Sequence, residues 1–213
     1  MDNLDLIAEK IRAGLTAKNA ARDLTLGRSR ELIRLCSLAI RATHREEFVE
    51  AEQLLATART AAEQMKAEIT SYPDLYYTGY TQDALKELAE AHMTFAVVND
   101  RPLPTPDELG VDTAAYLNGL CEAASELRRR TLDIIRHGRT VEGERLLAAM
   151  DDVYGVLVTM DFPDAITGGL RRSTDALRAV LERTRGDLTN SLQQEKLLRK
   201  LEAFERRIGE RET

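Results

Sequence analysis

Two pairs of glutamates have the spacing of metal ligands carried on helices. Glu87 and Glu90 are three residues apart, and Glu122 and Glu126 are four apart, so the members of each pair leave the same side of a helix. If the two helices face each other, the four carboxylates supply the oxygen ligands that Mg²⁺ takes, with Mn²⁺ as an alternative ion. Metal-dependent hydrolysis is the chemistry that such a site performs.

The positions of both pairs on their helices also allow a simpler interpretation. A helical wheel puts each pair on the polar face of an amphipathic segment. Acidic stripes of this kind are usually solvated surface without a ligand. The metal interpretation requires both polar faces to line one shared cavity, and periodicity does not establish that they do.

A row of arginines precedes the acids in the chain. Its members fall within a stripe about 60° wide on one face of a predicted helix, opposite apolar residues. They are Arg30, Arg34, Arg41 and Arg45, called here the arginine stripe. One interpretation is a solvated stripe neutralised by Glu31, Glu46 or Glu47. The other is a track for single-stranded nucleic acid, because guanidinium groups bind phosphate through two hydrogen bonds and stack on bases. His44 would then be a minor phosphate contact.

Composition limits the remaining possibilities. The chain has 213 residues, of which 43% are hydrophobic and 31% charged, which predicts one domain over residues 1–213 with one core. The net charge of -6 does not favour nucleic acid unless basic residues are segregated on one surface. Cys36 and Cys121 lie among apolar residues without paired spacing, as expected for reduced thiols in a cytoplasmic protein. No apolar run is long enough to cross a membrane.

The elements that must position these residues are helices throughout. Apolar residues recur every three or four positions, and no segment alternates as a strand does. We expect an all-α bundle of about seven helices, because the first two of the following segments are separated only by Gly27 and could form one helix. The segments are 4–24, 28–45, 47–70, 81–99, 113–137, 141–160, 167–185 and 188–208.

Local signals mark several helix ends. Thr105-Pro-Asp-Glu108 has the pattern of a capping box with proline in the first turn, and Gly110 closes that short helix. Gly138 and Gly186 suit left-handed positions just beyond helix ends. The segment 188–213 reads as an amphipathic C-terminal helix with a frayed end.

Several segments together resemble one known family. They are Lys86-Glu-Leu-Ala-Glu-Ala91, Tyr116-Leu-Asn-Gly119, Ser125-Glu-Leu-Arg128 and the stretch from Phe162 to Arg172. On these residues the chain resembles the translin family, particularly translin-associated factor X (TRAX) and its archaeal relatives. The resemblance covers nearly the whole chain. It implies an all-helical subunit of a hollow octamer, in which single-stranded RNA is bound and is cut by subunits of the factor X type.

The resemblance also implies roles for individual residues. Glu87 and Glu90 match the Glu-x-x-Glu element of the family, and Glu126 matches the acid of its Gly-Glu-Leu segment. Glu122 stands where the eukaryotic nuclease has a catalytic aspartate, so it keeps the ligand chemistry and adds one methylene. The basic stretch of translin corresponds here to residues 78–83, which carry no positive charge. RNA contacts are therefore expected from the arginine stripe and the histidine next to it.

We expect from these observations a cytoplasmic, Mg²⁺-dependent endoribonuclease that acts on single-stranded RNA inside a homo-octamer. Single-stranded DNA is an alternative ligand, and no membrane partner is expected. Glu87, Glu90 and Glu122 are the expected catalytic residues, and these three with Glu126 are the expected metal ligands. Enclosure would reconcile an acidic chain with RNA binding, because a basic interior can coexist with an acidic exterior. A non-catalytic oligomer or scaffold that binds nucleic acid is the first alternative, and a helical adaptor without a nucleic-acid partner is the second.

Overall fold

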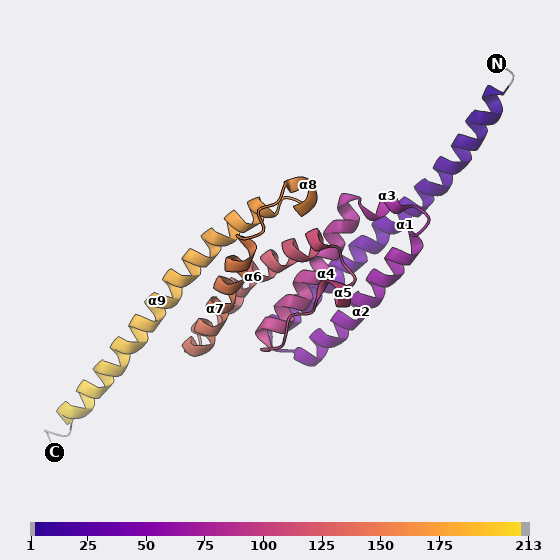
Figure 1. The fold of residues 1–213 in the computed structure, drawn as a ribbon. Coiled ribbons are helices and arrows are strands. Elements are labelled where there is room, and N and C mark those ends of the chain that lie inside the picture. Colours follow the sequence, from indigo (N-terminus) through magenta and orange to yellow (C-terminus); the bar gives the residue numbers. More distant parts are fainter. Residues whose placement is uncertain (1–2, 210–213) are drawn as a thin grey trace. The chain divides into compact units, whose positions relative to one another are not determined.

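The computed structural model describes residues 3–209, and within them every regular element is a helix (Figure 1). The expected all-α class is therefore correct. No helix in the described part of the chain combines the length and the apolar character needed to span a membrane. In chain order the helices are α1 (Leu4–His44), α2 (Phe48–Glu68), α3 (Pro73–Tyr76), α4 (Gly79–Val98), α5 (Pro106–Leu109), α6 (Thr113–Ile135), α7 (Thr140–Leu157), α8 (Asp164–Thr167) and α9 (Leu170–Gly209).

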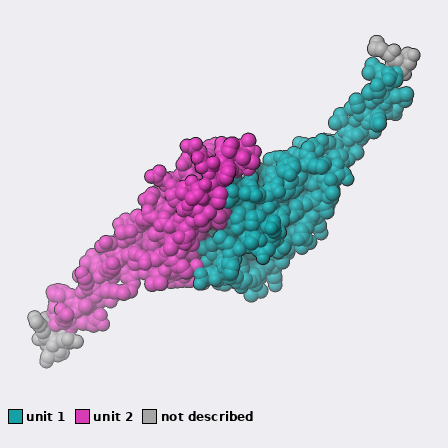
Figure 2. All heavy atoms as spheres, in the orientation of Figure 1, with its two compact units in different colours: residues 1–119 teal, residues 120–213 magenta. Residues whose placement is uncertain are grey.

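The helices form two compact units, residues 1–119 and residues 120–213, which Figure 2 draws in different colours. The boundary between the two units lies inside α6, which runs without a break from Thr113 to Ile135. A boundary inside a helix is not a linker of the kind that separates independent domains. The expectation of a single domain over residues 1–213 stays a prediction.

The first unit is built on three long helices. α1 packs against α2 and α4, and α2 also contacts α4. One face of α2 carries buried apolar residues at intervals of three or four, as in an amphipathic helix. They are Ala51, Leu55, Ala58, Ala62 and Met65. Leu32 of α1 and Leu85 and Leu88 of α4 are completely buried as well. α4 therefore belongs to the core of this unit.

α1 continues through Gly27, so the single-helix alternative is correct. A Cβ atom at Gly27 would have nothing within 4 Å, which shows that no close packing requires a glycine there. An interior glycine costs a helix about 1 kcal/mol relative to alanine. Burial of Leu32, Cys36 and Ala39 farther along the same helix offsets that cost.

The short helix α5 has the ends that its sequence predicts. The Thr105 hydroxyl accepts a hydrogen bond from the Glu108 backbone N–H, and the Glu108 carboxylate accepts one from the backbone N–H of Thr105, which is a complete capping box. Gly110 closes the helix with φ of 62°. Its carbonyl accepts a hydrogen bond from Lys66 Nζ at 2.7 Å, which ties this connection to α2.

The second unit is organised around α7 and α9, which pack against each other. Leu146 and Met150 of α7 and Leu177 and Leu181 of α9 are buried. The start of α7 also lies close to α9, as two observations show. A Cβ at Gly143 would lie 3.0 Å from Leu188 Cδ1, and the Thr140 hydroxyl donates a hydrogen bond to the Glu195 carboxylate at 2.9 Å.

The predicted end at Gly138 is correct, and the predicted end at Gly186 is wrong. Gly138 has φ of 73° just after α6, whereas Gly186 lies in the interior of α9. The helix continues because Thr184 and Leu188, on either side of the glycine, both face the core. The expected frayed end involves residues 210–213, which lie outside the described residues.

Candidate metal centre and arginine face

Glu87 and Glu90 project from α4, whose apolar side is buried in the first unit. Both side chains are half-buried, and the exposed fraction of the Glu87 side chain is 26%. Thr94, one turn beyond Glu90 on the same face, is completely buried. The acidic face of α4 is therefore not the freely solvated surface that the simpler interpretation assumes.

α6 approaches the α4 backbone unusually closely at this point. A Cβ atom at Gly119 would lie 2.7 Å from the Lys86 carbonyl oxygen, 2.8 Å from Ala89 Cβ and 3.1 Å from the Glu90 backbone nitrogen. All of these residues belong to the first unit. Gly119 thus packs on the turn of α4 that carries both glutamates.

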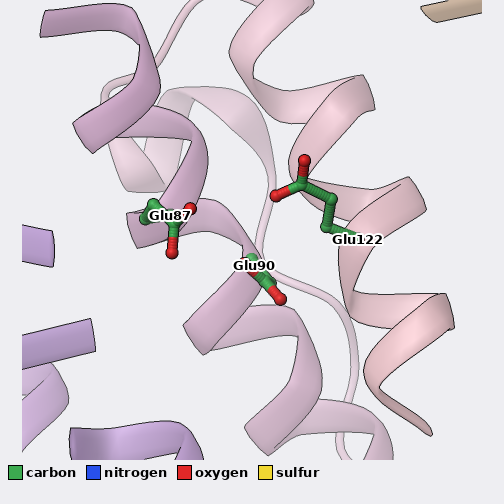
Figure 3. Close-up of side chains that lie close together, drawn as sticks. All are labelled: Glu87, Glu90 and Glu122. Carbon is green, nitrogen blue, oxygen red and sulfur yellow. The ribbon is translucent and has the colours of Figure 1, made fainter. Parts of the chain in front are cut away.

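Glu122 follows Gly119 by three residues on the same unbroken helix, so the two leave neighbouring positions on one side of α6. Figure 3 shows Glu87 and Glu90 on α4 and Glu122 on α6. One carboxylate oxygen from each of the three lies within 4.8 Å of the others, and all three side chains are half-buried. Three of the four acids singled out from spacing are therefore close together.

The fourth acid has a different environment. Glu126 is not part of that group, and its carboxylate lies 3.8 Å from the Arg129 guanidinium one turn later on α6. Its role as a metal ligand stays a prediction.

The charges of these acids act on two nearby cysteines. Burial, together with the charges of Glu87 and Glu90, raises the pKa of the Cys36 thiol well above its ordinary value. Burial and the charge of Glu122 raise the pKa of Cys121 to about 12. Both thiols therefore stay protonated at neutral pH, as expected of buried cysteines that do no chemistry. The same carboxylate charges would attract a cation placed between them.

All four members of the arginine stripe are exposed, and three of them lie within α1 on the side opposite the core. They are Arg30, Arg34 and Arg41. Across residues 3–209, none of the three has an ion pair or a side-chain hydrogen bond. Their guanidinium groups keep their full capacity to bind an anion.

Two of the acids expected to neutralise the stripe, Glu31 and Glu47, pair with arginines other than these three. Arg28 lies 3.0 Å from the Glu68 carboxylate and 3.7 Å from Glu31. Arg45, the fourth member of the stripe, lies 2.6 Å from Glu47. The simpler interpretation therefore describes Arg45 but not the other three members.

His44 differs from the arginines beside it, because its side chain is only 8% exposed at the end of α1. Sequence reasoning placed it next to the stripe but could not detect its burial. His92 behaves as an ordinary core histidine: its Nδ1 lies 3.0 Å from the Leu88 carbonyl oxygen, and burial lowers its pKa.

Comparisons with known proteins agree with this fold. No family model matches the chain. A solved structure of AfC3PO in complex with duplex RNA is 32% identical, with a TM-score of 0.82, and covers 88% of this chain and 97% of that one. A crystal structure of AfC3PO gives a TM-score of 0.81 at the same identity and coverage. Apo-NeC3PO, at 21% identity and a TM-score of 0.77, supports the fold alone.

An uncharacterized protein of Methanocaldococcus jannaschii is 28% identical over 186 residues, which are 86% of this chain and 82% of that protein. The helical fold and the 32% identity to AfC3PO over 97% of that chain define an all-α protein of the C3PO class. The chain belongs to the translin/TRAX-like family.

Proposed function

We propose that this protein is a metal-dependent endoribonuclease in which Glu87, Glu90 and Glu122 hold Mg²⁺. The observation that carries the proposal is the grouping of these three carboxylates on two helices, with one oxygen of each within 4.8 Å of the others. A divalent cation bound between three half-buried carboxylates would offset their mutual repulsion.

The donor set fits a hard divalent cation. It consists only of carboxylate oxygens, which Mg²⁺ and Mn²⁺ prefer, and three ligands from the chain leave coordination positions for water and for a phosphate oxygen. When bound, the ion would polarise that oxygen and lower the pKa of water. The carboxylates would orient the ion, and one of them would accept the proton of the attacking water.

RNA is the proposed substrate. AfC3PO, at 32% identity, has been solved with duplex RNA. The present chain offers three exposed arginines that form no ion pair with any described residue, Arg30, Arg34 and Arg41. Guanidinium groups bind phosphates without regard to sequence. We propose single-stranded RNA as the strand that is cut, because unpaired nucleotides can adapt to a fixed metal site. Duplex RNA and single-stranded DNA are the competing ligands to compare.

Assembly into a closed homo-oligomer, with eight subunits as expected from the family resemblance, is part of the proposal. Exposed apolar side chains at both ends of the chain support it, since such residues mark protein contacts when they gather along one helix. They are Leu4, Ile7, Ile11 and Leu15 of α1, and Leu197, Leu201, Phe204 and Ile208 of α9.

The test of the catalytic proposal is cleavage of an unstructured RNA with and without Mg²⁺. Glu90→Gln and Glu122→Gln should each lower the rate by at least about a hundredfold, because each change removes one negative ligand and keeps the shape of the side chain. RNA affinity should stay equal or increase.

Glu63→Gln, at an exposed position of α2, is the matched control and should cut like wild type. Equal cleavage by both site variants and wild type would refute the site. Binding without any Mg²⁺-dependent cleavage by wild type would favour the non-catalytic alternative.

A further inference from the structure

Position 119 of α6 has room for glycine but not for a residue with a Cβ atom. Glycine in a helix interior costs about 1 kcal/mol relative to alanine, and Gly119 lies between the buried residues Asn118 and Leu120. A Cβ there would lie 2.7 Å from Lys86 O and 2.8 Å from Ala89 Cβ, whereas ordinary van der Waals contact begins at 3.4 Å. The absent side chain lets the two helices approach each other.

The obstacle that a Cβ would meet is backbone, so no change of rotamer relieves it. Lys86 O and the Glu90 nitrogen belong to the turn of α4 on which Glu87 lies. A methyl group at position 119 would therefore push α6 away from α4, or twist it, by several tenths of an ångström. Any such movement is transmitted rigidly to Glu122, one turn later on the same helix.

We propose that Gly119 is a positioning residue for the metal centre, which sets the distance between the two glutamates of α4 and Glu122 of α6. The inference rests on the proposed function, because it concerns the ligands assigned there. Carboxylate ligands of a small cation tolerate little displacement, since Mg²⁺ and Mn²⁺ require near-ideal geometry at short ligand distances.

The experiment compares Gly119→Ala with wild type by two measurements. The first is titration with Mn²⁺, followed by the electron paramagnetic resonance signal of the free ion. Gly119→Ala should weaken Mn²⁺ binding by about tenfold or more, as changes behind metal ligands do. The second is the separation of α4 and α6 in crystal structures of both proteins, which should increase in the variant.

Two other glycines provide matched controls. Gly27→Ala adds a methyl group where nothing lies within 4 Å. Gly143→Ala adds one that meets the side-chain methyl groups of Leu188 and of Ile135 at 3.0 Å, and Ile135 is the last residue of α6, more than three turns beyond Glu122. Both should bind Mn²⁺ as wild type does, even though Gly143→Ala is destabilised. A general loss of stability is thereby separated from displacement of the ligands.

A second variant distinguishes positioning from damage to the fold. Ala89→Gly, added to Gly119→Ala, removes one of the two closest contacts of the new methyl group. It should recover part of the Mn²⁺ affinity although a further helical glycine lowers the stability. Recovery of metal binding together with a lower unfolding temperature is an outcome that a purely structural role does not produce.

The outcomes separate this inference from the proposed function. If wild type binds no Mn²⁺, the metal centre is refuted, and the helix separation in Gly119→Ala alone decides whether Gly119 sets the spacing. If wild type binds Mn²⁺ and Gly119→Ala binds it equally well, with α4 and α6 unmoved, the positioning role is overturned while the metal centre stands.

Discussion

At the scale of single residues, the three half-buried glutamates are the proposed metal ligands, and three exposed arginines are the proposed RNA contacts. The glutamates lie where α6 meets α4, and the arginines lie on the side of α1 that faces away from its core. Carboxylates that hold a cation repel phosphate when the cation is absent. RNA affinity should therefore come from Arg30, Arg34 and Arg41, and the acids should control only the chemistry.

We predict that replacing Arg34 and Arg41 together by alanine weakens RNA binding and flattens its salt dependence by about one unit of slope for each lost phosphate contact. Both side chains are exposed, so the fold should be kept. Binding measured by fluorescence anisotropy over a range of salt concentrations provides both quantities.

The control for this prediction removes the same charge elsewhere. Arg171 and Arg178 are exposed on α9, and their joint replacement by alanine should leave the slope unchanged. Equal losses in the two double variants would show that net charge, not the stripe, attracts RNA. Circular dichroism of both proteins checks that the helices are intact, because arginine stems also pack.

At the scale of elements, the two long helices α1 and α9 each contain a glycine that sequence signals treat as a break. Neither glycine has a packing reason, since added Cβ atoms at Gly27 and Gly186 meet nothing within 4 Å. Buried residues on both sides of each glycine keep the helix continuous. Gly119 and Gly143 differ, because close neighbours occupy the space that a Cβ would fill.

We predict that Gly186→Ala stabilises the protein by up to about 1 kcal/mol, the usual difference between glycine and alanine in a helix interior. Gly143→Ala should instead destabilise it, because the new methyl group crowds Ile135 and Leu188. Chemical denaturation followed by circular dichroism measures both. A destabilising Gly186→Ala would contradict a continuous α9 at that position.

At the scale of the whole molecule, each end of the chain carries apolar residues that the subunit itself leaves exposed. In α9 the spacing of Leu197, Leu201, Phe204 and Ile208 alternates between four and three residues, which is the repeat of a coiled-coil seam. Such a seam is stable only when another helix covers it. A homo-oligomer of the expected kind would cover it with a second copy.

We predict that the protein is a closed oligomer, most simply an octamer, in light scattering at micromolar concentration. Leu201→Glu with Phe204→Glu should shift it to smaller species, because charges at a buried seam are costly. Lys200→Glu on the same helix, also exposed, is the control for added negative charge. A wild-type monomer would remove the basis for an enclosed RNA site.

The sequence by itself determined the all-α class, the capping box at Thr105 and the glutamates that could bind a metal, because helical periodicity and capping are local properties. Its resemblance to the translin family agreed with the structural neighbours. Such features depend on residues that lie within about one turn of one another along a helix. Residues farther apart in the chain contribute nothing to them.

Tertiary structure decided which of these candidates meet. Spacing could not separate Glu126 from the other three acids. Nor could it show that, within residues 3–209, Arg30, Arg34 and Arg41 have no partner while Arg45 pairs with Glu47. The sequence also could not reveal the importance of Gly119. A Cβ atom at this position would lie within 3.1 Å of backbone atoms of α4. Contacts between helices depend on residues that are distant in the chain. The periodicity of one helix shows which of its faces is apolar, but not which other helix packs against that face.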